Sequence, residues 1–371
     1  MSAQMRDTEI RNAETAADAG SPDIGELRRQ QRRKASMRYW IASAGLLVVA
    51  VLAYLVLLGS GAMNLSLPEV LNVLQGGGDS SAIKVVWDLR LPVAIATVIV
   101  GAALGLAGSW TQTMARNALA SPDILGVSGG AAVLVVWGTV VSRPEFSQDM
   151  PVFWWRASLA LIGAAIVVVL LLLLGGVGTS NQVVLIGFAL SMMAQAIVAY
   201  LLKRAELLRA AEAQTWMAGS TGFVRSDVLL PLVLGLAPFV ILGFIASRDL
   251  PLLAHDDVSA LTLGVNIQRV RAMLLIAATG VVAIVVSAVG PIGFVALVAP
   301  QVARLITGTP TPQPISSAIT GAALITVCAV IAARVPASVP VGLVTSAIGG
   351  VVLVYLVWRA AKVQARAIGR S

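Results

Sequence analysis

Residues 91–115 read LPVAIATVIVGAALGLAGSWTQTMA and contain no Asp, Glu, Lys, Arg or His. A helix needs about 20 predominantly apolar residues to cross the hydrocarbon core of a bilayer. This stretch is long enough and apolar enough to do so. It therefore predicts a membrane-spanning helix rather than the core helix of a soluble domain.

Six further stretches of the chain also lack ionisable residues. They are Tyr39–Ser60, Ala157–Leu202, Val228–Ser247, Ala272–Ala303, Leu305–Ala333 and Val335–Trp358. The 371-residue chain is 58% hydrophobic and only 12% charged, whereas soluble domains are about 45–50% apolar and about 25% charged. This composition excludes a soluble enzyme and a nucleic-acid-binding domain, and it predicts a polytopic membrane protein.

Clusters of glycine, proline and polar residues divide the longer charge-free stretches into separate spans. They read GGVGTSNQ at 175–182, GPIG at 290–293 and GTPTPQP at 308–314. We therefore predict an all-α fold with ten spans, of which the second to fifth and the seventh to tenth are candidates for inverted repeats. The predicted spans are Tyr39–Leu58, Leu91–Gln112, Leu125–Ser142, Ala157–Leu174, Val183–Leu202, Leu229–Ala246, Ala272–Val289, Phe294–Thr307, Ile315–Ala333 and Val341–Trp358.

The basic residues that flank the first and last spans predict the orientation. Arg28–Arg38 holds six basic residues and no acidic one, and the segment after Trp358 holds four more. Flanks rich in Lys and Arg stay in the cytoplasm, so we predict that both termini are cytoplasmic and that the net charge of +8 is mainly topological. The expected organisation is a disordered tail with a basic juxtamembrane segment over residues 1–38, a transmembrane domain over 39–358 and a basic tail over 359–371.

Several kinds of chemistry have no candidate residues in this sequence. Cys328 is the only cysteine and His255 the only histidine, so neither a disulfide nor a metal site built from Cys and His is expected. A glycine-rich phosphate loop followed by Lys-Ser/Thr is also missing. We therefore expect the chain to be no enzyme, to bind no cofactor or metal, and not to bind ATP through this motif.

The predicted span interiors hold no ionisable residue, which carriers driven by protons or sodium usually keep at membrane depth. A transporter that is energised by another subunit fits this pattern better. An ion-coupled secondary transporter stays open as the alternative, because sodium sites can be built from carbonyl and hydroxyl oxygens.

The loop between the sixth and seventh spans contains HDDVSALTLGVNIQRVR at residues 255–271. Asp256 or Asp257 can cap the start of a short helix that reaches Leu263. Gly264 can end that helix in the left-handed conformation, and Asn266 can cap a second short helix leading into the next span. The pattern predicts a rigid cytoplasmic knob.

Three further motifs, together with this loop, resemble the permease subunits of ABC importers for iron-siderophores and cobalamin. Arg90–Pro92 and Arg116–Gly126 match the family patterns R-L-P-R and R-N-P-L-A-x-P-D-x-L-G, and Gly290–Arg304 matches G-x-I-G-F-V-x-L-x-x-P-H-x-A-R. The resemblance covers about Tyr39 to Trp358 and is greatest to the second permease of ferric-enterobactin-type systems. The motif residues carried over are Arg116, Asn117, Pro122, Asp123, Gly126, Pro300 and Arg304. Val93, Ala118 and Gln301 depart from the family's Arg, Pro and His.

This resemblance implies that the chain is one of two permease subunits and pairs with a paralogue. It also implies a multi-pass protein of a prokaryotic cell (plasma or inner) membrane. Two ATPase subunits with ATP and Mg are implied inside, and an extracytoplasmic siderophore-binding protein outside; nucleic acid is not a partner. The implied cargo is a ferric siderophore, with cobalamin or haem as alternatives in the same family.

Three groups of candidate site residues follow, of which the first and Arg90 come from the resemblance and the third comes from side-chain chemistry. The proposed ATPase-coupling loop comprises Asp256, Asp257, Ala260, Leu263, Gly264 and Arg269. Arg90 is the expected contact for the binding protein, with Lys84 and Arg334 as further candidates by position, although an arginine at an interface can simply extend its charge into water. Met192, Met193 and Gln195 offer a soft, weakly polar wall for a bulky chelate.

Overall fold

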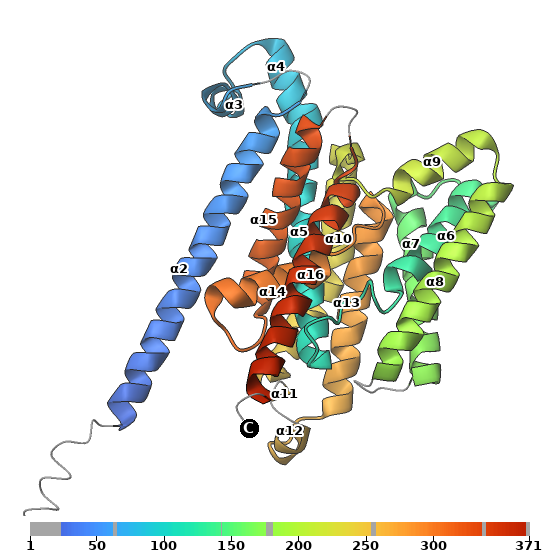
Figure 1. Cartoon of the computed structure of the whole chain (residues 1–371). Coiled ribbons are helices and arrows are strands. Elements are labelled where there is room, and N and C mark those ends of the chain that lie inside the picture. Colours follow the sequence, from blue (N-terminus) through green and yellow to red (C-terminus); the bar gives the residue numbers. More distant parts are fainter. Residues whose placement is uncertain are drawn as a thin grey trace, which may run out of the picture.

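The computed structural model describes residues 24–61, 65–141, 143–175, 181–253, 257–335 and 339–368. These residues form helices and connecting turns, with no strand among them, and the helices pack as a bundle (Figure 1). The elements are α2 (Ile24–Gly59), α3 (Leu67–Leu74), α4 (Ser80–Lys84), η1 (Val85–Arg90), α5 (Leu91–Ala115), α6 (Val127–Val140), η2 (Glu145–Ser147), α7 (Val152–Gly175), α8 (Asn181–Arg204), α9 (Leu207–Met217), η3 (Thr221–Phe223), α10 (Ser226–Ala246), η4 (Ser247–Asp249), α11 (Leu250–Leu253), α12 (Asp257–Thr262), α13 (Ile267–Val289), α14 (Val295–Thr307), α15 (Pro314–Arg334) and α16 (Val341–Ile368).

Each of the ten predicted spans corresponds to one helix, which confirms the all-α, polytopic fold. Among the described residues, eight helices are long and apolar enough to cross a membrane. The other two, α6 and α14, have 14 and 13 residues. Each begins directly after a residue in the left-handed conformation, Gly126 at φ 85° and Phe294 at φ 68°, and a left-handed residue cannot continue an α-helix on its N-terminal side. The backbone before each helix is therefore non-helical, which shortens it.

Two basic segments continue spanning helices instead of standing apart from them. α2 begins at Ile24, so Arg28–Arg38 forms the first turns of a 36-residue helix. α16 extends the last span to Ile368. Arg, Gln, Lys and Ala are good helix formers, which explains why the helices continue past the apolar core. Residues 1–23 and 369–371 of the predicted tails lie outside the described residues.

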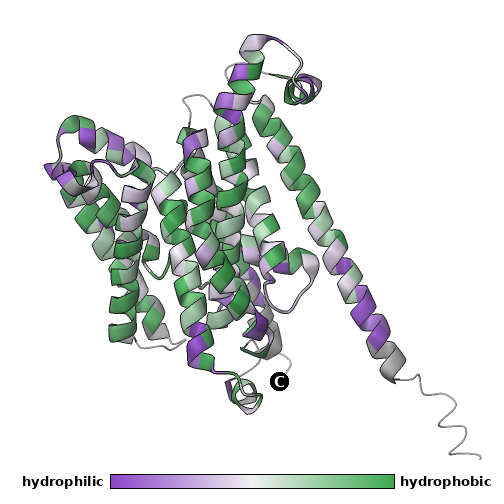
Figure 2. Ribbon diagram, turned by 180° about the vertical axis from the view of Figure 1, so that it is seen from behind, coloured by the Kyte–Doolittle hydropathy of each residue, from purple (hydrophilic) through white to green (hydrophobic). Residues whose placement is uncertain are grey.

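The polar residues gather at the two ends of the bundle, and the middle is apolar (Figure 2). One end, which we name the α9 end, carries α3, α4 and α9. The opposite end, named the α12 end, carries α11, α12, the start of α2 and the last turns of α16 (Figure 1). The two ends of the described chain therefore lie on the same side of the bundle.

α5 lies at the centre of the fold and packs against α15, α14 and α13. Three of its glycines permit this approach. A Cβ on Gly101 or Gly105 would overlap backbone carbonyl oxygens of Gly321 or Ser317 in α15, and one on Gly108 would overlap that of Ala296 in α14. Small residues let helix backbones approach closely in a membrane, so this glycine-rich face serves helix packing.

The helix contacts repeat when α5–α8 are matched with α13–α16. The contact between α6 and α7 corresponds to that between α14 and α15, and the contact of α5 with α15 corresponds to that of α13 with α7. α5 runs toward the α12 end, whereas α13 runs away from it (Figure 1). This is the arrangement expected of inverted repeats.

Candidate functional site

The loop predicted to form a cytoplasmic knob lies at the α12 end (Figure 1). α12 ends before Gly264, whose φ of 82° is left-handed. Its N–H bonds to the carbonyl of Leu261 at 2.9 Å, and the N–H of Val265 bonds to that of Ala260 at 3.0 Å. The prediction that Gly264 ends this helix in the left-handed conformation is confirmed. Asp256 lies outside the described residues.

Asn266 caps the helix that follows, as predicted. Its side-chain oxygen accepts a hydrogen bond from the backbone N–H of Arg269 at 3.1 Å. The prediction of a second short helix is wrong, because α13 runs unbroken for 23 residues from Ile267 into the span. No proline interrupts this segment, and its first glycine is Gly280, so nothing ends the helix after its first turns.

The base of the knob is buried, and its tip exposes apolar side chains. Ala260 is fully buried, whereas Leu261 and Leu263 are 60% and 65% exposed, and Arg269 is also exposed. A groove of 530 Å³ lies beside the knob. It is lined by Asp257, Leu261, Gly264, Val265, Asn266, Ile267, Gln268 and Arg271. Exposed apolar residues rimmed by polar ones are typical of a protein-binding surface.

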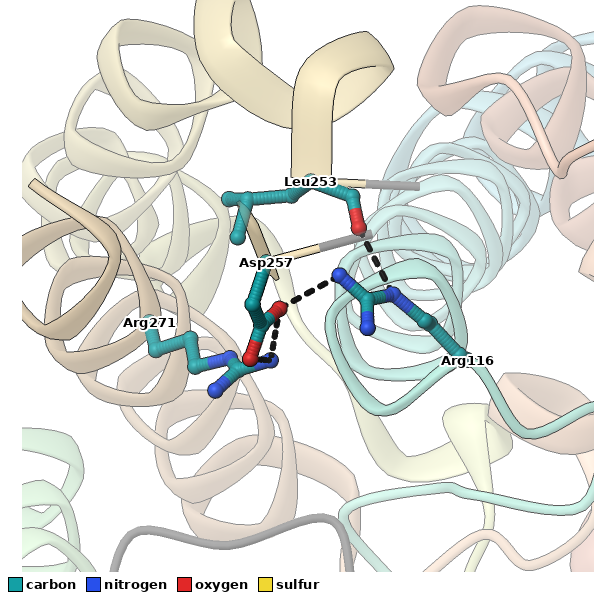
Figure 3. Close-up of polar contacts among 4 residues, drawn as sticks. All are labelled: Arg116, Leu253, Asp257 and Arg271. Atoms are coloured by element: carbon teal, nitrogen blue, oxygen red, sulfur yellow. Dashed lines mark hydrogen bonds and ion pairs between the residues drawn. The ribbon is translucent and has the colours of Figure 1, made fainter. Parts of the chain in front are cut away.

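Asp257 anchors the knob to two other helices (Figure 3). Its carboxylate accepts hydrogen bonds from Nη2 of Arg271 at 3.0 and 3.2 Å and from Nη2 of Arg116 at 2.5 Å. Nε of Arg116 also donates to the carbonyl of Leu253 at 2.8 Å. Asp257, predicted as a helix cap, is the first residue of α12 and its side chain serves these ion pairs.

The two arginines keep Asp257 ionised. Partial burial alone would raise the pKa of this carboxyl. The hydrogen bond from Arg116 and the positive charges of Arg271 and Arg116 outweigh that effect and lower the pKa below its ordinary value. Arg271 was not among the predicted site residues, and no contact between Arg116 and the loop was predicted. The sequence separation of 141 residues between Arg116 and Asp257 hides this contact.

The Arg116–Gly126 motif forms the turn between α5 and α6. Arg116 ends α5 with a φ of 48°, and the side chain of Asn117 accepts a hydrogen bond from the N–H of Leu119 at 2.9 Å. Pro122 is buried, and Gly126 lies against the backbone of Gly187 in α8. These motif residues therefore shape the backbone at the α12 end.

Asp123 is the unusual member of this turn. Its Oδ1 accepts a hydrogen bond from the Ser128 hydroxyl, and its Oδ2 is buried with no hydrogen-bond partner among the described residues. Burial raises the pKa of this carboxyl to about 6, although the bond from Ser128 works in the opposite direction.

Gln301, which replaces the family histidine, joins α14 to α5. Its Nε2 donates to Oε1 of Gln112 at 2.5 Å, and Nε2 of Gln112 donates to the Leu297 carbonyl at 2.8 Å. Both glutamines are buried. Gln301 therefore forms a buried hydrogen bond at the position of the family histidine. Pro300 lies inside α14 and Arg304 in its last turn, where Arg304 and Arg116 both line a 180 Å³ cavity.

The three residues predicted to meet a binding protein all lie at the α9 end. Lys84 and Arg334 are exposed and end α4 and α15. Arg90 is half-buried, and its Nη1 donates to the carbonyl of Leu58 at 2.8 Å. Arg90 therefore also holds η1 against the end of α2. This structural role is an alternative or additional reason for an arginine at this position.

Met192, Met193 and Gln195 lie on the side of α8 that this chain leaves uncovered. Met192 and Met193 are 52% and 50% exposed, and Gln195 is also exposed. The described part of α16 carries exposed apolar residues as well, among them Val351 and Val354. The two helices thus offer apolar surface to lipid, to cargo or to another subunit.

Comparison with known proteins agrees with this architecture. The model of the FecCD transport family matches residues 46–359. The ferric enterobactin transport system permease protein FepG of Escherichia coli (strain K12) is 34% identical over 328 residues, covering 86% of this chain and 96% of that protein. The hemin transport system permease protein HmuU of Yersinia pestis is 30% identical over 320 residues, covering 85% and 94%.

A solved structure described as an inward-facing conformation of a metal-chelate type ABC transporter has the same fold. Its TM-score is 0.69 at 24% identity, and the match covers 86% of this chain and 99% of that one. The match of the family model to most of the chain, together with these relatives, shows that this chain belongs to the FecCD transport family.

Proposed function

We propose that the chain is the transmembrane permease subunit of an ATP-binding-cassette importer that takes up a ferric siderophore. Family membership supports this proposal, and the observation that carries it is the knob at the α12 end. Its apolar tip is exposed, while Asp257 fastens its base to α5 and α13. An exposed and firmly anchored knob suits a subunit that receives mechanical work from a partner.

Each proposed partner has a surface on the chain. Two cytoplasmic ATPase subunits, which hold ATP and Mg, are assigned to the complex, one of them contacting Leu261, Leu263 and Arg269. The binding protein meets the α9 end through Arg90, with Lys84 and Arg334 nearby. A second, paralogous permease covers the exposed faces of α8 and α16. With these partners, we assign the chain to the plasma membrane of a prokaryote, with both termini cytoplasmic.

The cargo is proposed from chemistry and relatives together. The names of FepG and HmuU concern ferric enterobactin and hemin, both of them bulky iron chelates. Met192, Met193 and Gln195 are proposed to line the pathway between the two permeases, since thioethers are soft and adapt to irregular shapes. A ferric siderophore is the first choice, and haem or cobalamin is the alternative.

Purification of the complex and uptake in proteoliposomes test this proposal. We expect the ATPase subunits to co-purify with the wild-type chain and to be lost from a Leu261→Asp/Leu263→Asp variant, because a buried unpaired carboxylate opposes docking. The matched control is Leu207→Asp/Leu208→Asp, which alters two exposed leucines at the α9 end.

Uptake is measured with ferric enterobactin, a ferric hydroxamate, hemin and cobalamin, each labelled. ATP-dependent uptake of an iron chelate supports the proposal. ATPase subunits that bind the α12-end variant as tightly as the wild type contradict the assignment of the knob, and uptake of none of the four compounds contradicts the function.

A further inference from the structure

Three helices meet at the carboxylate of Asp257, and one of them, α5, is distant in the sequence from the other two. Arg116 belongs to the end of α5, Asp257 begins α12, and Arg271 lies in the second turn of α13. The two arginines approach the carboxylate from opposite sides (Figure 3). Their side chains are 31% and 14% exposed and that of Asp257 is 43% exposed, so water screens these pairs less than it screens fully exposed ones.

The two arginines make different connections although they share one carboxylate. Arg271 lies on α13, which the chain already joins to α12 through residues 263–266. Arg116 instead reaches a separate helix. Its Nη2 contacts Asp257 and its Nε contacts the Leu253 carbonyl, so it holds the start of α12 and the end of α11 together. Arg116 therefore gives the knob a link to α5 that the local chain does not provide.

The helix that receives this link is the central one. α5 is buried along most of its length and packs against α13, α14 and α15. Because close-packed protein interiors have low compressibility and transmit strain, a displacement at the end of α5 is passed to the helices around it. The link at Arg116 therefore connects an exposed surface to the core.

The backbone conformation of Arg116 also indicates that its side chain has a function. Its φ of 48° lies in the left-handed region. Glycine adopts this region without steric cost, whereas other residues are strained there. Glycine would suit the backbone better at this helix end. An arginine placed here despite that strain indicates a task for its guanidinium.

We propose that Arg116 is the positioning residue that transmits movement of the α12 knob to α5. The inference rests on the proposed function, in which an ATPase subunit moves the knob. In this account Arg116 contributes to the number of cargo molecules moved per ATP and not to the docking of the ATPase. Arg271 stabilises the knob but transmits little of its movement, because the chain already joins α13 directly to α12.

The test uses the complete complex in proteoliposomes, with whichever labelled compound the wild type transports in the panel above. Three quantities are measured for each variant: ATP hydrolysis, uptake per ATP hydrolysed, and the melting temperature of the complex. Arg116→Gly removes the guanidinium while relieving the backbone strain, so the variant is expected to fold. Arg271→Gln is the matched control, because it too leaves Asp257 one arginine partner.

We expect Arg116→Gly to assemble with its ATPase and to hydrolyse ATP, while uptake per ATP falls about tenfold, within the usual range of coupling between sites. Arg271→Gln should retain most of its uptake per ATP. Arg116→Lys should be impaired as well, since one ammonium group cannot reproduce the two-directional contact of a guanidinium.

Unchanged uptake per ATP in Arg116→Gly, or an equal loss in Arg271→Gln, would overturn the assignment of Arg116 and leave the proposed function standing. A wild-type complex without ATP-dependent uptake would contradict the proposed function, and this inference with it.

Discussion

Gly264 is the residue whose conformation defines the knob. Its φ of 82° is closed to proline, which is fixed near −65°. Gly264→Pro should therefore distort the connection between α12 and α13, and we expect ATP hydrolysis to continue while uptake per ATP is lost. Asparagine tolerates the left-handed region, and a Cβ at this position meets no atom within 4 Å. Gly264→Asn is thus the control; wild-type uptake in the proline variant would refute the role of this turn.

Asp123 predicts a pH dependence of stability. Its pKa is about 6 in the folded protein, above the ordinary value near 3.9. The native state therefore binds the proton more tightly than the unfolded state, and the stability gained from it is present below about pH 4 and is lost as the pH rises through 6. Burial of the charge costs at most about 2–3 kcal/mol above that pH.

Asp123→Asn should remove this cost while its side-chain oxygen still accepts the bond from Ser128. We expect the variant complex to melt higher than the wild type at pH 7.5 and to lose this advantage near pH 4.5. A difference in melting temperature between variant and wild type that stays the same at every pH would show that Asp123 is not buried as a charge.

The close packing of α5 against α15 gives a prediction at the scale of elements. A Cβ on Gly105 would overlap the Ser317 carbonyl, and that backbone cannot move without shifting the helix. Overpacking of this kind costs about 1–3 kcal/mol, so Gly105→Ala should lower the melting temperature of the purified complex. In Gly45→Ala the new methyl group meets no atom within 4 Å, and this control should melt like the wild type. Equal melting of the two variants would contradict the described packing.

Sequence patterns predicted the spanning helices well. In a membrane, the backbone N–H and C=O groups of a long charge-free segment form their hydrogen bonds within the segment when it folds as a helix. Sequence patterns failed where tertiary contacts decide. The sequence did not show that α3 and α4 fold over the end of α2. The absence of Pro and Gly from residues 267–279, by contrast, could have indicated the continuous helix after Asn266. The knob was predicted from its glycine and cap residues, since capping is local. Its attachment through Arg116 joins distant segments and was not predictable.

The whole molecule combines three features that fit an importer subunit. Its middle is apolar, its α12 end carries an anchored knob, and its α8 and α16 faces are exposed in the single chain. The open faces suit a subunit that other chains cover, and we expect transport to require a partner permease, ATPase subunits and a binding protein together. In the proposed function, ATP hydrolysis on those partners drives the cargo across the membrane.

The most direct measurement of that claim is uptake of the labelled chelate by the complete complex when its ATPase subunits are catalytically inactive. The inactive subunits are assembled as before, and an ion gradient is imposed or abolished independently. We predict that uptake stops with the inactive ATPase whether or not a gradient is present, and that it continues with the active ATPase after the gradient has been abolished. Uptake that persists with the inactive ATPase and collapses with the gradient would contradict the account and identify an ion-coupled carrier.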